Sequence, residues 1–210
     1  MLFWSMTTLL LIRHADTAAD PNTPVIWGRA PGIHLSAIGQ KQAERLASCL
    51  VKNGIAALYS SPIERAVETA SYIARGIGIR FDIAEGLNEV DYGRWAGRSY
   101  QELGEDDEWR IYNNCRSCSR IPGGESILEV TSRAVAEVGR LRSAHPGELI
   151  AAVSHADVIR ALLAHFMGLP IDLALRLEIS LASVSALRFY RGDLRVLLIN
   201  GIGDEPVERA

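Results

Sequence analysis

Aromatic residues and cysteines are scarce in this chain, since aromatics make up 7% of its 210 residues and there are only three cysteines. A small, odd number of cysteines argues against a disulfide framework and for a reducing compartment, so we expect a cytoplasmic protein. An excess of basic residues is also missing, because the formal net charge is -3. Proteins that bind duplex nucleic acid usually carry a basic excess, so we expect no nucleic acid partner.

Long apolar runs are absent as well. No run approaches the roughly 20 residues that a membrane-spanning helix needs, so we expect no membrane association. The opening segment, MLFWSMT, has no basic flank and no cleavage-site pattern, and a secretory signal is therefore not expected. With 48% hydrophobic and 22% charged residues, the composition is that of an ordinary globular protein, and we expect one domain over residues 1–210.

Short apolar runs alternate with segments of helical periodicity. Strands are expected at 8–12, 56–60 and 149–153, and a hairpin over 184–199. Helices are expected between Ser36 and Gly54, from Pro62 toward Gly76, over 127–141 and over 157–167. Residues 86–124 are less regular and are interpreted as a small cap-like insertion. The alternation predicts an α/β fold, a three-layer α/β/α sandwich with a mostly parallel central sheet.

Basic and imidazole side chains follow three of the expected strands. Arg13 and His14 come after the first strand, Ser61 and Arg65 after the second, and His155 after the strand at 149–153. In open α/β sheets, ligands bind beyond the carboxyl ends of the strands, so these side chains are expected to converge. Guanidinium groups suit phosphate oxygens, and a neutral imidazole can attack phosphorus. The pattern predicts phosphoryl transfer in which no metal is required.

Signatures of competing phosphate chemistries are missing. The sequence contains neither G-x-x-x-x-G-K-S/T nor H-E-x-x-H. A thiol phosphatase needs an arginine six residues after the nucleophilic cysteine, and none of the three cysteines has one. Cys115 and Cys118 form a lone C-x-x-C, which lacks the further ligands of a zinc site and the preceding strand of a redox site.

Six segments together resemble one known family. The chain is similar to the histidine phosphatase superfamily, also called the phosphoglycerate mutase-like family, over nearly its whole length. The matching segments are LLLIRHADT at 9–17, LSAIGQKQA at 35–43, YSSPIERAVETA at 59–70, NEVDYGRWAG at 88–97, GGES at 123–126 and VSHADVIRA at 153–161.

The resemblance implies a role for each matched site residue. His14 would form a phosphohistidine, and Glu89 would give a proton to the leaving oxygen, for which a pKa raised toward neutrality is expected. The residues expected to bind the phosphoryl group or the substrate are Arg13, Arg65 and His155, with lesser contacts from Thr17, Ser61, Ala156 and Arg29.

The sequence also departs from the family pattern. Ala15 and Ala156 follow the two histidines where the family commonly has glycine, and Asp16 replaces the usual Glu or Gln. Asp20 stands where many members have an asparagine that can donate to phosphate. Because a carboxylate repels phosphate, Asp20 must turn away, meet Arg29 or mark a different substrate arrangement.

The leading interpretation is a phosphomonoester hydrolase that acts on a small phosphorylated metabolite, with no cofactor. One alternative is a cofactor-dependent phosphoglycerate mutase, which the short middle region disfavours. Another is a phosphate-binding protein without turnover. The substrate and the oligomeric state, including a homodimer, stay open. Trp95, Trp109 and Tyr112 fit either a pocket wall or cap packing.

Overall fold

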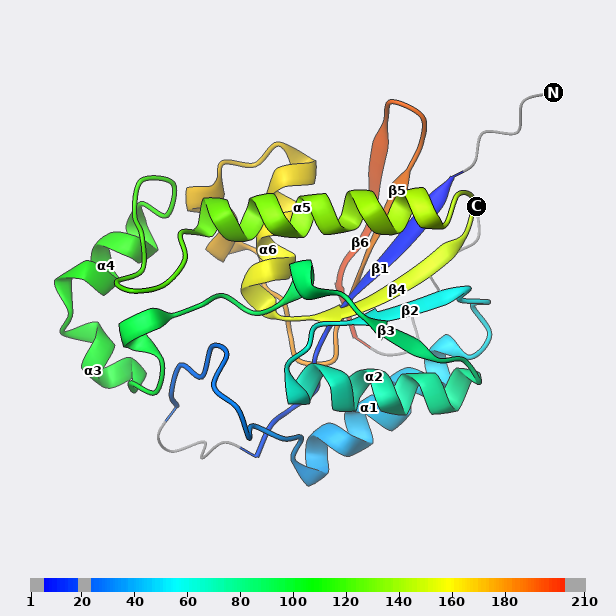
Figure 1. The fold of residues 1–210 in the computed structure, drawn as a ribbon, viewed down its shortest axis with the longest axis horizontal. Helices are drawn as coiled ribbons and strands as arrows, with labels where there is room; N and C mark the ends of the chain where they lie inside the picture. Colours follow the sequence, from blue (N-terminus) through cyan, green and yellow to red (C-terminus); the bar gives the residue numbers. More distant parts are fainter. Residues whose placement is uncertain (1–5, 19–23, 203–210) are drawn as a thin grey trace.

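A six-stranded mixed sheet forms the centre of the computed structural model, which describes residues 6–18 and 24–202 (Figure 1). The strand order is β3-β2-β4-β1-β5-β6. The first four of these strands run parallel, and β5 and β6 are antiparallel to their neighbours. The strands are β1 (Thr7–Arg13), β2 (Ala57–Ser60), β3 (Phe81–Ile83), β4 (Leu149–Ser154), β5 (Val184–Phe189) and β6 (Leu194–Gly201).

Helices cover both faces of the sheet (Figure 1). Alternate residues of β1 face opposite sides: Leu10 and Ile12 pack among residues of α1 and α2, whereas Leu9 and Leu11 pack among residues of α5 and α6. The three-layer α/β/α architecture is therefore confirmed. The helices are α1 (Ala37–Leu50), α2 (Glu64–Ile77), α3 (Tyr100–Gly104), α4 (Asp107–Asn114), α5 (Ile127–Ala144) and α6 (Ala156–Met167), with short 3-10 helices η1 (Glu85–Leu87), η2 (Gly93–Trp95) and η3 (Ile171–Arg176).

Most element boundaries follow the sequence signals. Ser36 caps α1 by accepting a hydrogen bond from Gly39 N, and the expected hairpin forms between β5 and β6. α1 ends at Leu50, before the expected limit at Gly54, because a turn intervenes in which Asn53 N donates to Leu50 O. The opening residues 1–5 and Asp20 lie outside the described residues. Within the described ranges, no helix is long and apolar enough to cross a membrane.

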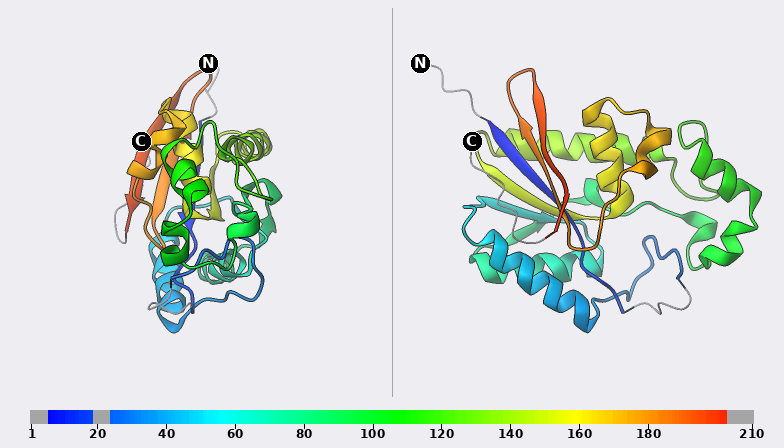
Figure 2. Two further views of the ribbon diagram at one scale, coloured as in Figure 1. Left: turned by 90° about the vertical axis from the view of Figure 1, so that its left-hand side faces the viewer. Right: turned by 180° about the vertical axis from the view of Figure 1, so that it is seen from behind.

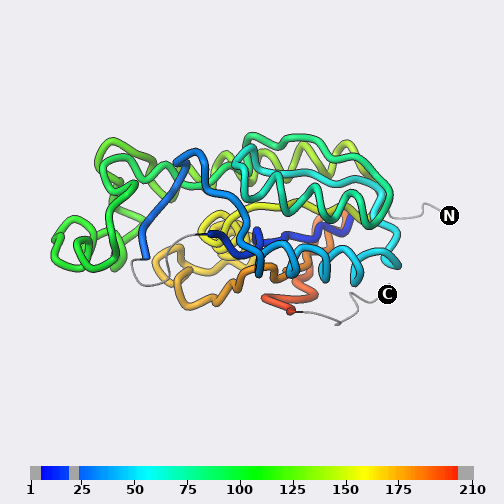
Figure 3. Tube along the Cα trace, turned by 90° about the horizontal axis from the view of Figure 1, so that it is seen from below, coloured from blue at the N-terminus to red at the C-terminus, as the bar shows by residue number. Residues whose placement is uncertain are grey.

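Within the segment 86–124, helices α3 and α4 project beyond the sheet at one end of the molecule (Figures 1 and 3), whereas η1 at the start of the segment packs on α5. Seen from that end, its two helices lie in front of the sheet (Figure 2). An aromatic cluster stabilises it, because the buried Trp95 lies 5.2 Å from Trp109 and 5.4 Å from Tyr112, measured between ring centroids. Trp95 and Tyr112 are therefore packing residues of this segment.

The two ends of this projecting segment meet backbone to backbone. Arg94 N donates to Pro122 O at 2.9 Å, and Glu125 N donates to Asp91 O at 3.0 Å. Gly93 and Gly124 lie where these two segments cross. A Cβ on either glycine would overlap backbone atoms of the opposite segment. The excursion consequently leaves the body of the protein and returns to it at one point.

Gly39 is expected to tolerate substitution poorly. It lies in the first turn of α1, and a Cβ there would overlap the carbonyl oxygen of Asp16, two residues after His14. Overpacking of this kind costs about 1–3 kcal/mol, so Gly39→Ala should lower the free energy of unfolding in a urea titration.

Gly139 supplies the matched control. It is an exposed helical glycine of α5 with open space where a Cβ would go, so Gly139→Ala should raise the free energy of unfolding by about 0.5–1 kcal/mol. Equal effects of the two substitutions would contradict the close approach of α1 to the chain that follows β1.

Candidate active site

Backbone pairing brings the three predicted strand ends together. In the parallel register, Arg13 of β1 lies opposite Ser154 of β4, and Ser60 of β2 lies opposite Val153. The pairing continues past the strands, since His14 N donates to Ser154 O at 2.9 Å and Ser61 N donates to Val153 O at 2.9 Å. The side chains that follow the three strands therefore lie at one edge of the sheet.

His14 is buried and held in one tautomer. Its Nδ1 lies 2.8 Å from Ala15 O, and because a carbonyl oxygen can only accept, Nδ1 carries the proton. Nε2 is thus left with a lone pair, to which Arg65 Nε donates at 3.2 Å. Burial and the nearby charge of Arg65 hold the pKa of His14 well below its usual value, so the imidazole is neutral.

Arg65, the second residue of α2, connects the other groups of the site. One of its nitrogens, Nη2, donates to His155 Nδ1 at 3.2 Å and to Gly28 O at 2.9 Å. His155 Nε2 donates in turn to Ser61 Oγ at 2.8 Å. Burial and the charge of Arg65 lower the pKa of His155 well below its usual value. The two imidazole rings, 5.3 Å apart, are both neutral and face one guanidinium group.

Glu89 reaches the same cluster from the chain between η1 and η2. Its Oε2 lies 3.4 Å from His155 Nδ1 and 3.6 Å from Arg65 Nη2. Burial raises the pKa of Glu89 to about 7, although the charge of Arg65 opposes the shift. The expected shift toward neutrality is confirmed, and near neutral pH this carboxyl group can either give or take a proton.

Two arginines donate hydrogen bonds to the backbone at Glu89. Arg133 of α5 donates to the carbonyl oxygens of Asn88 and Glu89 at 2.7 and 3.0 Å, and Arg29 Nε donates to Glu89 O at 2.8 Å. The carboxylate of Glu125 accepts from both guanidinium groups. These contacts fix the position of Glu89. The sequence analysis assigned Arg29 to the phosphate or substrate, but its guanidinium group donates to Glu89 O and to Glu125.

A pocket of about 410 Å³ opens over this cluster. Arg13 lines it with a buried Nε that has no hydrogen-bond partner, while its Nη1 donates to Ile179 O. Thr17 and Ala156 also line the pocket, and Ala156 is the first residue of α6, whose N-terminus favours anions. Arg29 is not among the lining residues. A larger, open groove of about 930 Å³ lies elsewhere, beside α2 and β3.

The residues that line the pocket and that the sequence analysis missed include Tyr92, Arg116, Asp157 and Arg160. Asp157 and Arg160 lie inside the matched segment 153–161, where their spacing of three on a helix was an available signal. Tyr92 donates to Asp157 Oδ2 at 2.6 Å. Arg116 lies within the C-x-x-C segment, which was considered only for metal or redox chemistry. No pattern in the sequence indicated that Arg116 or Tyr92 would reach the site.

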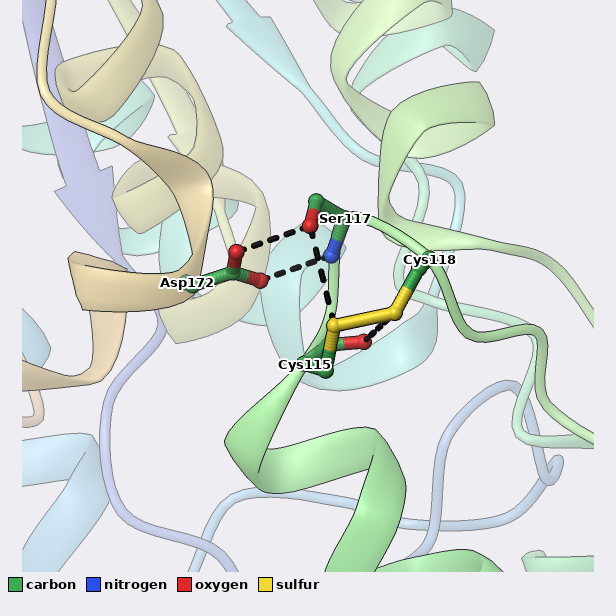
Figure 4. The surroundings of a disulfide bond; sticks show 4 residues. All are labelled: Cys115, Ser117, Cys118 and Asp172. Atoms are coloured by element: carbon green, nitrogen blue, oxygen red, sulfur yellow. Dashed lines mark hydrogen bonds between the residues drawn. A yellow bond between two sulfur atoms is a disulfide. The ribbon is translucent and has the colours of Figure 1, made fainter.

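Cys115 and Cys118 form a disulfide, with their Cα atoms 5.8 Å apart (Figure 4). The sequence analysis argued against a disulfide framework and did not anticipate this single bond. The turn that follows α4 explains the difference, because it brings the two side chains to one side of the chain. With this pair bonded, the cysteine count no longer indicates a compartment.

Within residues 6–18 and 24–202, no group of three or more His, Cys, Asp or Glu side chains is arranged to hold a metal ion.

The model of the histidine phosphatase superfamily (branch 1) matches residues 9–201. A bifunctional protein of Mycobacterium tuberculosis is 32% identical over 201 residues, which cover 94% of this chain and 54% of that protein. This chain thus spans about half the length of that relative. Phosphoserine phosphatase 1 of Hydrogenobacter thermophilus is 29% identical over 172 residues, 80% of this chain and 79% of that protein.

Solved structures agree with the family match. The structure of YhfR from Bacillus stearothermophilus superposes with a TM-score of 0.87 and 27% sequence identity, covering 96% of this chain and all of that one (100%). The geometry of His14, Arg65 and His155 lies within the matched region. The chain therefore belongs to the histidine phosphatase superfamily (branch 1).

Proposed function

We propose that this protein hydrolyses a phosphomonoester of a small metabolite through a phosphohistidine at His14, without a metal ion. The observation that carries the proposal is the neutral imidazole of His14, whose Nε2 lone pair faces the guanidinium group of Arg65. A nucleophile beside a fixed cation suits phosphoryl transfer, in which catalysis depends on positioning and on stabilising charge at the equatorial oxygens.

In the first step, His14 Nε2 forms a bond to phosphorus while the bond from phosphorus to the leaving oxygen breaks. Protonated Glu89 gives its proton to that oxygen. The developing phosphoimidazole keeps the hydrogen bond from its Nδ1 to Ala15 O, while Arg13 and Arg65 donate to the phosphoryl oxygens. A pKa of about 7 leaves a large fraction of Glu89 protonated at neutral pH.

In the second step, water attacks phosphorus and the bond from phosphorus to Nε2 breaks, which returns the electron pair to His14. Glu89, now a carboxylate, takes the proton from the water. One group with a pKa near the working pH thus serves as acid and then as base. Because Arg65 Nη2 can only donate, His155 Nδ1 accepts from it, and Ser61 Oγ accepts from His155 Nε2; these two contacts position His155 against Arg65.

We also propose that residues 86–124 act as a cap within a single domain. Tyr92, Tyr100, Trp109, Asn113 and Arg116 of this segment line the pocket, which supports a role in choosing the substrate. A homodimer and a cytoplasmic location stay predictions from the sequence.

The function is tested by measuring phosphate release from a panel of phosphorylated metabolites in EDTA. Release that resists EDTA supports the hydrolase. The panel includes 3-phosphoglycerate with and without 2,3-bisphosphoglycerate, because formation of 2-phosphoglycerate without net release would identify a mutase instead. Binding of the phosphorylated compounds without any turnover would identify a phosphate-binding protein.

A further inference from the structure

The carboxylate of Asp157 joins three segments of chain at the wall of the pocket. Asp157 is the second residue of α6, comes two residues after His155, and is buried. Its Oδ2 accepts from Tyr92 Oη at 2.6 Å and lies 3.3 Å from Nη1 of Arg116, in the turn after α4. Its Oδ1 accepts from Arg160 Nη1 at 3.0 Å, within α6 itself. One carboxylate therefore ties the start of α6 to the chain at Tyr92 and to the chain at Arg116.

Tyr92 lies on the same short stretch of chain as Glu89, three residues further on. The stretch 89–92 reaches the start of α6 at both of its ends. Glu89 Oε2 lies 3.4 Å from His155 Nδ1, and Tyr92 bonds to Asp157 two residues later. The attachment of this stretch to α6 thus consists of one long contact, made by the proposed acid, and one short hydrogen bond, made by Tyr92.

The other contacts of the stretch lead away from α6. Arg133 and Arg29 donate to the carbonyl oxygen of Glu89, and both guanidinium groups are paired with Glu125. They hold the backbone of Glu89 but do not connect it to the helix that follows His155. A hydrogen bond to a charged acceptor is short and strong, so the bond from Tyr92 to Asp157 is suited to fix the stretch against α6.

We propose that Asp157 is a positioning residue, which through Tyr92 fastens the stretch 89–92 to α6 and so places the carboxyl group of Glu89 for proton transfer. The inference rests on the proposed function, in which Glu89 gives and then takes the proton. Asp157 touches no reacting atom in this scheme and acts through another residue. A misplacement of about 1 Å can cost a reaction roughly 10²-fold, so a contact remote from phosphorus can control the rate.

The charge of Asp157 acts on Glu89 as well. Burial opposes the ionisation of Asp157, but the charge of Arg116 and the hydrogen bonds at its carboxylate hold its pKa below the usual value. The charged or titratable groups that face Glu89 come from the elements around it: Arg13 of β1, Arg65 of α2, Arg133 of α5, Arg29 before α1, and His155 and Asp157 at the start of α6. Of these six, Asp157 alone is an anion. Burial raises the pKa of Glu89, the charge of Arg65 opposes the shift, and the charge of Asp157 adds to it.

The first test is a double-mutant cycle between Tyr92→Phe and Glu89→Gln. Tyr92→Phe removes the hydrogen bond and keeps both charges. It should slow formation of the phosphoprotein from an alkyl phosphate by about tenfold, the effect of losing a hydrogen bond to a charged group. p-Nitrophenyl phosphate, which leaves without a proton, should be slowed much less. In the Glu89→Gln background Tyr92→Phe should slow the step no further, because the group that it positions is gone.

The second test is the pH profile of Asp157→Asn, which removes the charge and keeps an oxygen that can accept from Tyr92. Without the negative charge, Glu89 should lose its proton at lower pH. The fall of the first-step rate with rising pH should therefore move down by about one pH unit. Tyr92→Phe, which keeps the charge of Asp157, should leave the midpoint of that fall near the wild-type value.

Two matched controls come from the segment 86–124 and its contacts. Tyr112→Phe removes a buried hydroxyl that has no hydrogen-bond partner. Asp172→Asn changes a carboxylate of η3 that accepts from N and Oγ of Ser117, in the same turn as Arg116 (Figure 4). Both should keep the wild-type dependence on leaving group and on pH. Circular dichroism checks that each variant is folded.

The outcomes separate this inference from the proposed function. If Glu89→Gln is selective for the leaving group but its effect adds to that of Tyr92→Phe, the positioning role is overturned and the acid stands. A folded Asp157→Asn with wild-type rate and midpoint has the same meaning. If Asp157→Asn does not fold, the cycle with Tyr92→Phe decides. If Glu89→Gln slows both leaving groups equally, the proposed acid fails, and this inference fails with it.

Discussion

His14→Ala is expected to lower kcat for phosphate release by about 10³-fold or more, because the covalent route is lost and only positioning and electrostatics remain. Arg65, which contacts His14, is also hydrogen-bonded to Gly28 O and to His155, so replacing His14 by alanine should leave Arg65 in place. The measurement is steady-state phosphate release together with quenching of the reaction in alkali, which should trap a phosphoprotein that is stable to base and labile to acid with wild type alone.

His34→Ala is the matched control for this prediction. His34 is an exposed histidine that pairs with Glu68 and lines the larger groove, away from the pocket of His14. Its replacement should leave turnover close to wild type. A His14→Ala protein that retains more than about a tenth of wild-type turnover would argue against the phosphohistidine, since covalent catalysis contributes far more than tenfold.

Glu89→Gln is expected to have the second largest effect, with a strong dependence on the leaving group. General acid catalysis contributes about 10²- to 10⁴-fold, so turnover of an alkyl phosphate should fall by that amount. p-Nitrophenyl phosphate should lose much less in its first step, because p-nitrophenolate leaves without a proton. Single-turnover rates of phosphoprotein formation measure this difference.

Glu85→Gln serves as the control, since Glu85 is an exposed carboxylate at the start of η1 in the same stretch of chain. It should change neither rate. Equal slowing of the two leaving groups by Glu89→Gln would show that Glu89 does not give the proton to the leaving oxygen.

The raised pKa of Glu89, about 7, makes the pH dependence of the two steps opposite in sign. The first step needs the protonated acid, so its rate should fall as pH rises through about 7. The second step needs the carboxylate, so decay of the phosphoprotein should slow as pH falls through about 7. With an ordinary pKa near 4.5, the first step would already be slow at pH 7. Both pH dependences, that of the first step and that of the second, should disappear in Glu89→Gln.

The part of the site that the sequence predicted is the part attached to strands. His14, Ser61 and His155 each follow a strand that could be recognised from its apolar run, and the parallel register then determines that they meet. Glu89 needed the family resemblance, because its surroundings come from α5 and from the chain before α1.

The remaining features depend on contacts between distant segments. Arg29 contacts Glu125, which lies far along the chain, so this pairing could not be predicted from the neighbours of Arg29 in the sequence. Arg116 lies in a segment without periodicity, whose path is set by the aromatic cluster and by Ser117 contacting Asp172. The disulfide depends on the geometry of one turn, which composition does not specify.

The crossing of the chain at Gly93 and Gly124 has a consequence for how this fold can diversify. Since the excursion between them begins and ends at one point, its length and sequence can change with little effect on the sheet below. Glu89 precedes the crossing, and its backbone is held by Arg133 of α5, so the acid stays in place whatever the excursion contains. Under the proposed function, the acid and the cap are thus encoded in separable stretches of sequence, and selection can exchange the cap without rebuilding the chain that carries the acid.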